Sequence, residues 1–215
     1  MMVAAVRFDR MTEVELRERR LRFFSALSSP TRVAIIDALK ANGAMSEKAL
    51  GEWLVAVGDL APQARPGLGR VHLGVLEEAN LIVQDSAGTW TVGNGLQGGV
   101  HWTGIDPHDE ELSAAAQEFE RVLTERRIQR VRHWARTQWS DWPAEWSTTA
   151  VATDNIHHLT PSELGWLDEQ LHELTNQLEQ RVTARREAAG RDGERPVFRT
   201  FAAFPWGPSP DRGRG

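Results

Sequence analysis

The sequence predicts an α+β fold that is mainly α, on three observations. Apolar residues recur at helical spacing in several segments, most of which follow a good N-capping residue. One segment of the N-terminal half, residues 81–92, combines β-prone residues with a polar turn, which predicts a hairpin. The chain has 215 residues, of which 40% are hydrophobic, so it is long enough for one large or two small domains.

Capping residues locate the first three helices. Thr12 and Glu15 form a capping box, which predicts a helix over residues 13–27. Ser29 caps the next helix and Pro30 occupies its first position, where a missing N–H is tolerated. Ser46 caps the third helix. Behind each cap, apolar residues at spacings of three and four supply a face that can be buried.

A fourth helix is predicted over residues 66–80, immediately before the hairpin. Pro66 and Gly67 interrupt the preceding segment, and Asn80 stands where a left-handed residue commonly ends a helix. The apolar positions at helical spacing are Leu68, Val71, Val75 and Leu76, with Leu73 on the flank. Taken alone, this pattern favours an ordinary amphipathic core helix, and only the order of the neighbouring elements favours a recognition helix.

The order of these elements resembles the ArsR-type winged-helix repressors. Residues 27–32, LSSPTR, are similar to the family's entry motif, and residues 70–82, RVHLGVLEEANLI, are similar to its recognition helix and following strand. The resemblance covers roughly residues 20–95. It implies a winged helix-turn-helix DNA-binding domain, which we place at residues 12–95, with its recognition helix near residues 66–80.

The resemblance also implies which residues contact DNA. Base edges would be contacted by the groove-facing half of the recognition helix: Arg65, Gly67, Leu68, Arg70 and Val71. Phosphates would be contacted by Thr31, Arg32, Ser46 and Lys48. Among these side chains, Arg70 has the planar fork that binds guanine in a bidentate manner. His72 matches the family's usual histidine, although local packing or hydrogen bonding is the favoured role there.

Composition limits the function classes. The formal net charge is −5, yet residues 1–100 contain 11 basic and 11 acidic side chains, so we expect weak, salt-sensitive DNA affinity from this half. With no cysteine, no tyrosine, no Gly-x-Ser-x-Gly motif and no phosphate loop, the chain is not expected to be an enzyme. It has no apolar run long enough for a signal peptide or a membrane span, so we expect a cytoplasmic protein with no membrane partner.

A Gly-rich connector, residues 96–110, follows the predicted reader domain. It and its surroundings contain five potential metal ligands: His101, Asp106, His108, Asp109 and Glu110. They lack the i, i+4 spacing of a helical histidine pair, so we expect neither a metal nor another cofactor.

The predicted C-terminal domain, residues 111–206, begins with a long helix over residues 112–139. Its apolar side is marked by Leu112, Ala115, Phe119, Val122 or Leu123, Val131 and Trp134. Its other side contains Arg121, Arg126, Arg127, Arg130, Arg132 and Arg136. A solvated face that pairs with nearby glutamates is favoured over a DNA-binding one. A strand at residues 196–206, paired with 147–158, and a disordered tail at 207–215 complete the prediction.

Thr160 and Glu163 form a second capping box, which predicts another long helix. Its apolar residues form a near-heptad seam: Leu164, Leu167, Leu171, Leu174, Leu178 and Val182. One helix cannot bury such a seam alone, so it packs on its own domain or on a second subunit, and we favour a homodimer. Four tryptophans precede it, Trp134, Trp139, Trp142 and Trp146, which either line a pocket for a small apolar effector or form core or dimer interface.

These observations predict a dimeric transcription regulator, most simply a repressor that reads a palindromic operator in double-stranded DNA. The alternative is a protein-interaction module on a winged-helix scaffold with weak or no specific DNA binding. Two departures from the family pattern favour this alternative. Gly67, Leu68 and Gly69 replace the usual polar residues, and the wing tip contains Asp85 and no base.

Overall fold

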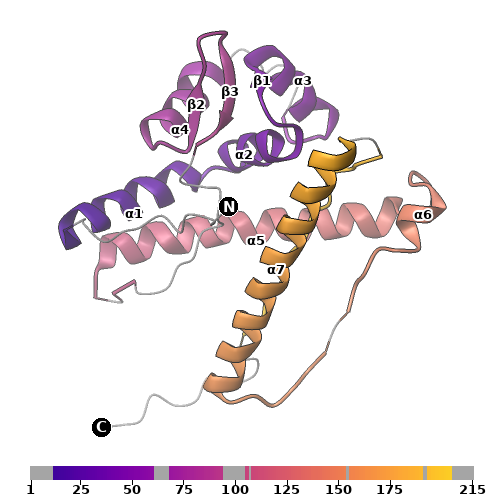
Figure 1. The fold of residues 1–215 in the computed structure, drawn as a ribbon. Helices are drawn as coiled ribbons and strands as arrows, with labels where there is room; N and C mark the ends of the chain where they lie inside the picture. Colours follow the sequence, from indigo (N-terminus) through magenta and orange to yellow (C-terminus); the bar gives the residue numbers. More distant parts are fainter. Residues whose placement is uncertain are drawn as a thin grey trace. The chain divides into compact units, whose positions relative to one another are not determined.

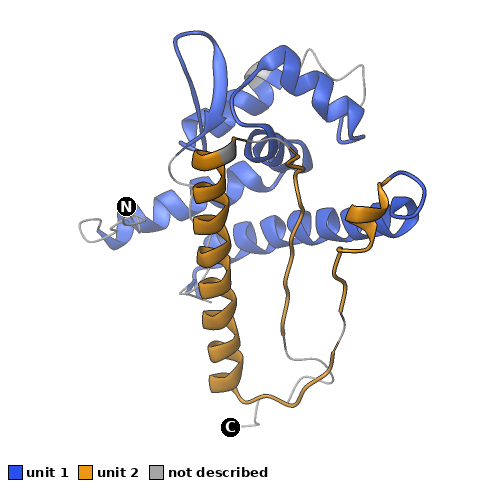
Figure 2. Ribbon diagram, turned by 45° about the vertical axis from the view of Figure 1, so that its right-hand side comes forward, with its two compact units in different colours: residues 1–141 blue, residues 142–215 orange. Residues whose placement is uncertain are grey.

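The structure is a computed structural model, and it describes residues 12–60, 68–93, 105–106, 108–153, 155–190 and 193–204. The chain divides into two compact units, residues 1–141 and 142–215 (Figure 2). The mainly helical α+β class is confirmed. The boundary between units lies later than the sequence analysis placed it, because the long helix α5 (Glu110–Thr137) packs against α1 (Glu13–Leu27) in the first unit.

The first three helices begin where the capping residues predict. The Thr12 side chain accepts the Glu15 N–H and completes the capping box of α1. Helix α2 (Pro30–Asn42) has Pro30 in its first turn, although Ser29 makes no side-chain cap hydrogen bond. The Ser46 hydroxyl accepts the Ala49 N–H at 3.2 Å and starts α3 (Glu47–Ala56).

The predicted fourth helix consists of two parts. A π-helical turn, η2 (Gly69–Leu73), leads into α4 (Gly74–Glu78). Asn80 adopts a φ of 58°, which confirms the left-handed stop expected after this segment. The beginning of the predicted helix, residues 66–67, lies outside the described residues.

A three-stranded antiparallel sheet, in the order β1-β3-β2, covers one end of this unit (Figure 1). The predicted hairpin is present as β2 (Ile82–Gln84) and β3 (Thr89–Val92). The third strand, β1 (Met45–Ser46), pairs Met45 with Trp90 immediately before α3 begins. Two residues are too few to show strand alternation, so the sequence analysis did not predict β1.

Helices α1 and α5 begin at the same end of the unit and run side by side (Figure 1). At that end Arg17 pairs with Asp109, and further along Phe119 packs against Phe23 and Phe24 with ring centroids 5.9 and 5.7 Å away. These rings join one continuous core, which also includes Ile35, Leu50, Leu54, Leu76, Ile82 and Trp90. Helix α5 is therefore part of the core of the first unit.

The second unit contains a short helix, α6 (Ala144–Ser147), and a long one, α7 (Pro161–Ala189). The capping box of Thr160 and Glu163 starts α7 as predicted, and Gly190, at a φ of 71°, ends it. The predicted strand pair of 147–158 with 196–206 is wrong for the described part of these segments, where no strand is present. Within the described residues, no helix has the length and apolar character needed to cross a membrane.

Gly93 generates a stability prediction. Its N–H donates to the Leu81 carbonyl at 2.9 Å, and a Cβ built on it would lie 2.6 Å from the Asn80 carbonyl oxygen. Gly93→Ala should therefore lower the free energy of unfolding by about 1–3 kcal/mol, because backbone atoms must move to admit the methyl group. Chemical denaturation measures this loss.

Gly165→Ala is the matched control, since an added Cβ there meets nothing within 4 Å in the interior of α7. Alanine in a helix interior should stabilise by roughly 0.5–1 kcal/mol. Equal effects of the two substitutions would show that the close approach at Gly93 does not exist in solution.

Candidate nucleic-acid interface

The inner side of the predicted recognition segment is formed by Leu68, Leu73 and Leu76, which are at most 1% exposed. Leu68 and Leu73 are five residues apart, and the i→i+5 geometry of the π turn brings such residues near one face. The prediction that Leu68 contacts base edges is therefore wrong, because its side chain belongs to the core. Helical spacing already groups Leu68 with Leu76 on the apolar side, so the base-contact assignment came from the resemblance alone. An α-helical period does not place residues 68 and 73 on one face, and the burial of Leu73 depends on the π turn.

The outer side of the segment includes Val71, whose side chain is 60% exposed. Arg70 lies in the same π turn, so the backbone at this position is described while its side chain is not. Arg65 and Gly67 lie outside the described residues. Base contacts by Arg65, Gly67, Arg70 and Val71 therefore stay predictions, with Val71 at an accessible position.

His72 lies between the inner and outer sides and is partly buried. Its Nδ1 atom is buried and has no hydrogen-bond partner among the described residues. Burial and, secondarily, the charge of Arg32 lower the pKa of His72 below its ordinary value of 6.5. The imidazole is therefore neutral at pH 7 and offers no positive charge to a phosphate. This arrangement supports a packing role for His72.

Two predicted phosphate contacts have structural roles. The Arg32 guanidinium donates to the carbonyls of Ala26 and Ser25, so it satisfies acceptors at the C-terminal end of α1. Ser46 caps α3 through its hydroxyl. Of the other two predicted contacts, Lys48 is exposed and Thr31 is partly buried.

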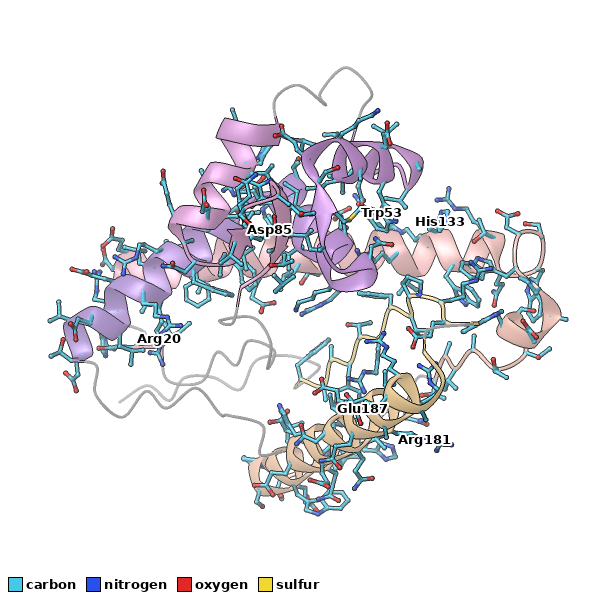
Figure 3. The ribbon with its side chains drawn as sticks, turned by 45° about the horizontal axis from the view of Figure 1, so that its top comes forward. Arg20, Trp53, Asp85, His133, Arg181 and Glu187 are labelled. Carbon is cyan, nitrogen blue, oxygen red and sulfur yellow. The ribbon has the colours of Figure 1, made fainter. Side chains whose placement is uncertain are left out.

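The hairpin tip is organised by Asp85 (Figure 3). Its Oδ1 atom accepts from the Ala87 N–H at 2.9 Å, the Thr89 N–H at 2.8 Å and the Thr89 hydroxyl at 3.0 Å. The hydrogen bonds from Thr89 are the main cause that lowers the pKa of Asp85 below its usual value. The three hydrogen bonds explain why an aspartate occupies this turn. Its ionised carboxylate places a negative charge at the tip.

A partly buried ion cluster joins α5 to α2 and to the turn after α3. The Arg126 guanidinium donates to Asp59 in a bidentate manner, at 3.0 and 2.7 Å, and to Asp37 of α2 at 2.7 Å. Arg130 donates to the same Asp37 carboxylate at 2.7 Å. Asp59 lies in the turn three residues after α3, where its N–H donates to the Leu54 carbonyl at 2.8 Å, so one side chain of α5 binds both α2 and the turn after α3.

Burial disfavours the charge on Arg126, but the hydrogen bonds and charges of Asp59 and Asp37 outweigh it and raise the pKa of this guanidinium above its ordinary value. The sequence analysis placed Arg126 on the solvated face of its helix, which is wrong, because the residue is 8% exposed. A signal was present: Arg126 lies seven residues after Phe119 and four after Val122, on the apolar stripe of the helix.

Asp109 of the connector has a structural role. Asp109 caps α5 by accepting the Leu112 N–H and binds Arg17 through both of its oxygens. The Arg17 hydrogen bond is the main cause that lowers the pKa of Asp109 below its usual value. His101 lies outside the described residues.

The tryptophans differ in exposure and are divided between the two units. Trp139 is 73% exposed, so it does not line an enclosed pocket within its unit, contrary to its suggested role. Trp142 is 36% exposed, and Trp134 and Trp146 are partly buried. An effector pocket stays a prediction.

Comparison of the chain with protein-family models, with curated proteins and with solved structures found no match.

The ion cluster predicts a strong effect of Arg126→Met. The substitution removes the cation that Asp37 and Asp59 share and leaves Asp37 with Arg130. Breaking such a partly buried cluster should cost about 2–4 kcal/mol of unfolding free energy. Arg121→Ala is the control, because this arginine is on the same helix and pairs with Glu118 on the surface. Urea denaturation should show a loss for Arg126→Met and no resolvable change for Arg121→Ala. Indistinguishable midpoints would contradict the role of the cluster.

His72 predicts a pH dependence. Its folded-state pKa is depressed, so the unfolded chain binds more protons, and stability falls as pH drops through about 6.5. His72→Gln removes this titration and leaves the other histidines in place. The loss in urea midpoint between pH 7.5 and pH 5.5 should therefore be smaller in the variant than in the wild type. An equal loss in both proteins would show that His72 is not desolvated.

Proposed function

We propose that residues 12–95 form a winged helix-turn-helix domain of the ArsR type, and that the chain is a DNA-binding transcription regulator, most simply a dimeric repressor. Each subunit would place the η2–α4 segment in the major groove, and two subunits would read half-sites about 34 Å apart. The β2–β3 hairpin would be the wing. Double-stranded DNA is therefore the proposed partner.

One observation carries this proposal. The η2–α4 segment buries Leu68, Leu73 and Leu76 in the core of its unit, and a short antiparallel hairpin follows it. At its outer side Val71 is 60% exposed, and the adjacent position is Arg70. This combination supports a rigid reading head, because a recognition helix needs one face held by the domain and the other accessible to base edges.

The charges support weak rather than tight binding. Arg32 is already used at the end of α1, and the wing tip contains the Asp85 carboxylate. The remaining cations among the predicted contacts are Lys48, Arg65 and Arg70. So small a number of phosphate or base contacts predicts an affinity that falls with salt, with a shallow slope.

The negative wing tip favours a second candidate function. An interaction module for a basic protein partner would keep the same scaffold and use the acid at the tip and the exposed Val71 as contacts. Fold alone does not separate the two functions. DNA retention measured across a salt series separates them.

We expect Arg70→Ala to weaken binding to the preferred genomic fragment by about 1–3 kcal/mol, the value of one bidentate base contact. Fragments from the region upstream of the protein's own coding sequence are the first to test. Binding to unrelated DNA should change less, because such binding depends on phosphates. Arg121→Ala, on the surface of α5, is the matched loss of one positive charge.

Lys48→Ala provides a second, different outcome. It should weaken binding to all fragments alike and reduce the slope of log affinity against log salt by about 1. No preference among fragments at low salt, or an Arg70→Ala variant that binds as the wild type does, would contradict the regulator proposal. The interaction module would then be the better description.

A further inference from the structure

Helix α7 has an apolar seam that its own unit does not bury. The seam runs from Leu164 to Val182, about 27 Å at 1.5 Å per residue. Leu174 and Leu178, in its middle, are 59% and 46% exposed. The other seam residues are only partly buried. The apolar seam is therefore left uncovered at the centre of the helix.

The N-terminal half of α7 is acidic, and its arginines lie in the C-terminal half. Residues 161–173 contain four carboxylates and no lysine or arginine, which gives a net charge of −4 with His172 neutral. Residues 174–189 contain three arginines and two glutamates, a net charge of +1. The arginines lie at Arg181, labelled in Figure 3, and at Arg185 and Arg186. Glu194 pairs with Arg185 and Arg186 and offsets one of their two positive charges.

We propose that the α7 seam binds the α7 seam of a second copy of this chain in antiparallel orientation. The inference rests on the dimer in the proposed function and specifies its interface. A parallel pair would place the −4 halves side by side, whereas an antiparallel pair places each acidic half beside the arginine-containing half of its partner. The antiparallel arrangement also opposes the two helix dipoles.

The charge separation has a simpler partial explanation, since acids near the N-terminus and bases near the C-terminus also stabilise a single helix. That explanation does not account for the exposed leucines, which are on the same helix. An antiparallel register centred between residues 174 and 175 accounts for both the charge separation and the exposed leucines. It places Leu171 opposite Leu178, Leu167 opposite Val182, and Asp168 opposite Arg181 of the second copy.

The first test is the solution mass of the full chain. The wild type should have twice the monomer mass of 24.1 kDa, and the double variant Leu174→Glu/Leu178→Glu should have the monomer mass. Val151→Glu is the control, because Val151 is 86% exposed in the same unit and lies outside the seam. It should stay dimeric. A monomeric wild type, or a double variant that stays dimeric, would overturn the proposal.

The second test determines the orientation and does not depend on how the double variant folds. The natural chain has no cysteine, so Leu167→Cys and Val182→Cys each introduce one thiol per subunit. Under mild oxidation, the antiparallel pair predicts little disulfide in either variant alone and a cross-linked heterodimer when the two are mixed. Disulfide formation within each variant alone would indicate a parallel pair and overturn the proposal.

Failure of this interface and failure of the proposed function are distinguishable. Arg70→Ala tests DNA reading in the first unit, whereas the thiol test reports on α7 without DNA. A chain that reads DNA but forms no 167–182 cross-link would retain the regulator function and lose this dimer. A chain that forms the cross-link but retains no DNA would have this dimer and would contradict the regulator function.

Discussion

The geometry of the first unit depends on the ion pairs that the Arg126 guanidinium forms. This guanidinium joins α5 to α2 through Asp37 and to the turn after α3 through Asp59. A planar, permanently charged fork suits this position, because two carboxylates from separate elements must be satisfied at once in a largely buried site. The long helix therefore supports α2 and the turn after α3, although it lies much later in the chain than either.

In the first unit, polar side chains that could contact DNA bind backbone groups of the protein instead. Arg32, Ser46 and Asp85 stand at positions where the family resemblance suggests contact with DNA or with a phosphate backbone. In the structure they satisfy the ends of α1 and α3 and the turn of the hairpin. Backbone groups at such places must find partners, so polar residues there are explained without a ligand. The proposed DNA reading consequently depends on few side chains.

Local chemistry made the element boundaries predictable from the sequence. Thr12, Ser46 and Thr160 start helices, and Asn80 ends one, because each satisfies the backbone through its own side chain or conformation. Features that depend on distant partners were not predictable in the same way. The assignment of α5 to the first unit depends on Phe119 and Arg126 meeting α1 and α2, and the two-residue β1 exists only because β3 pairs with it. The predicted strand at 196–206 and its predicted partner at 147–158 both relied on β-propensity, which depends on packing against neighbours and does not by itself form a sheet.

The π turn at Gly69–Leu73 affects how this segment can be aligned with the recognition helix of the family that it resembles. A turn closed by i→i+5 hydrogen bonds contains one residue more than an α-helical turn, so the faces before and after it are out of phase with an ideal helix. Transferring contacts position by position from a family with an uninterrupted helix then shifts the assignment by one residue. Leu68 is an instance, since the resemblance implies a base contact for a side chain that lies in the core. For this segment, correspondence has to be established by which side chains are buried, not by residue count.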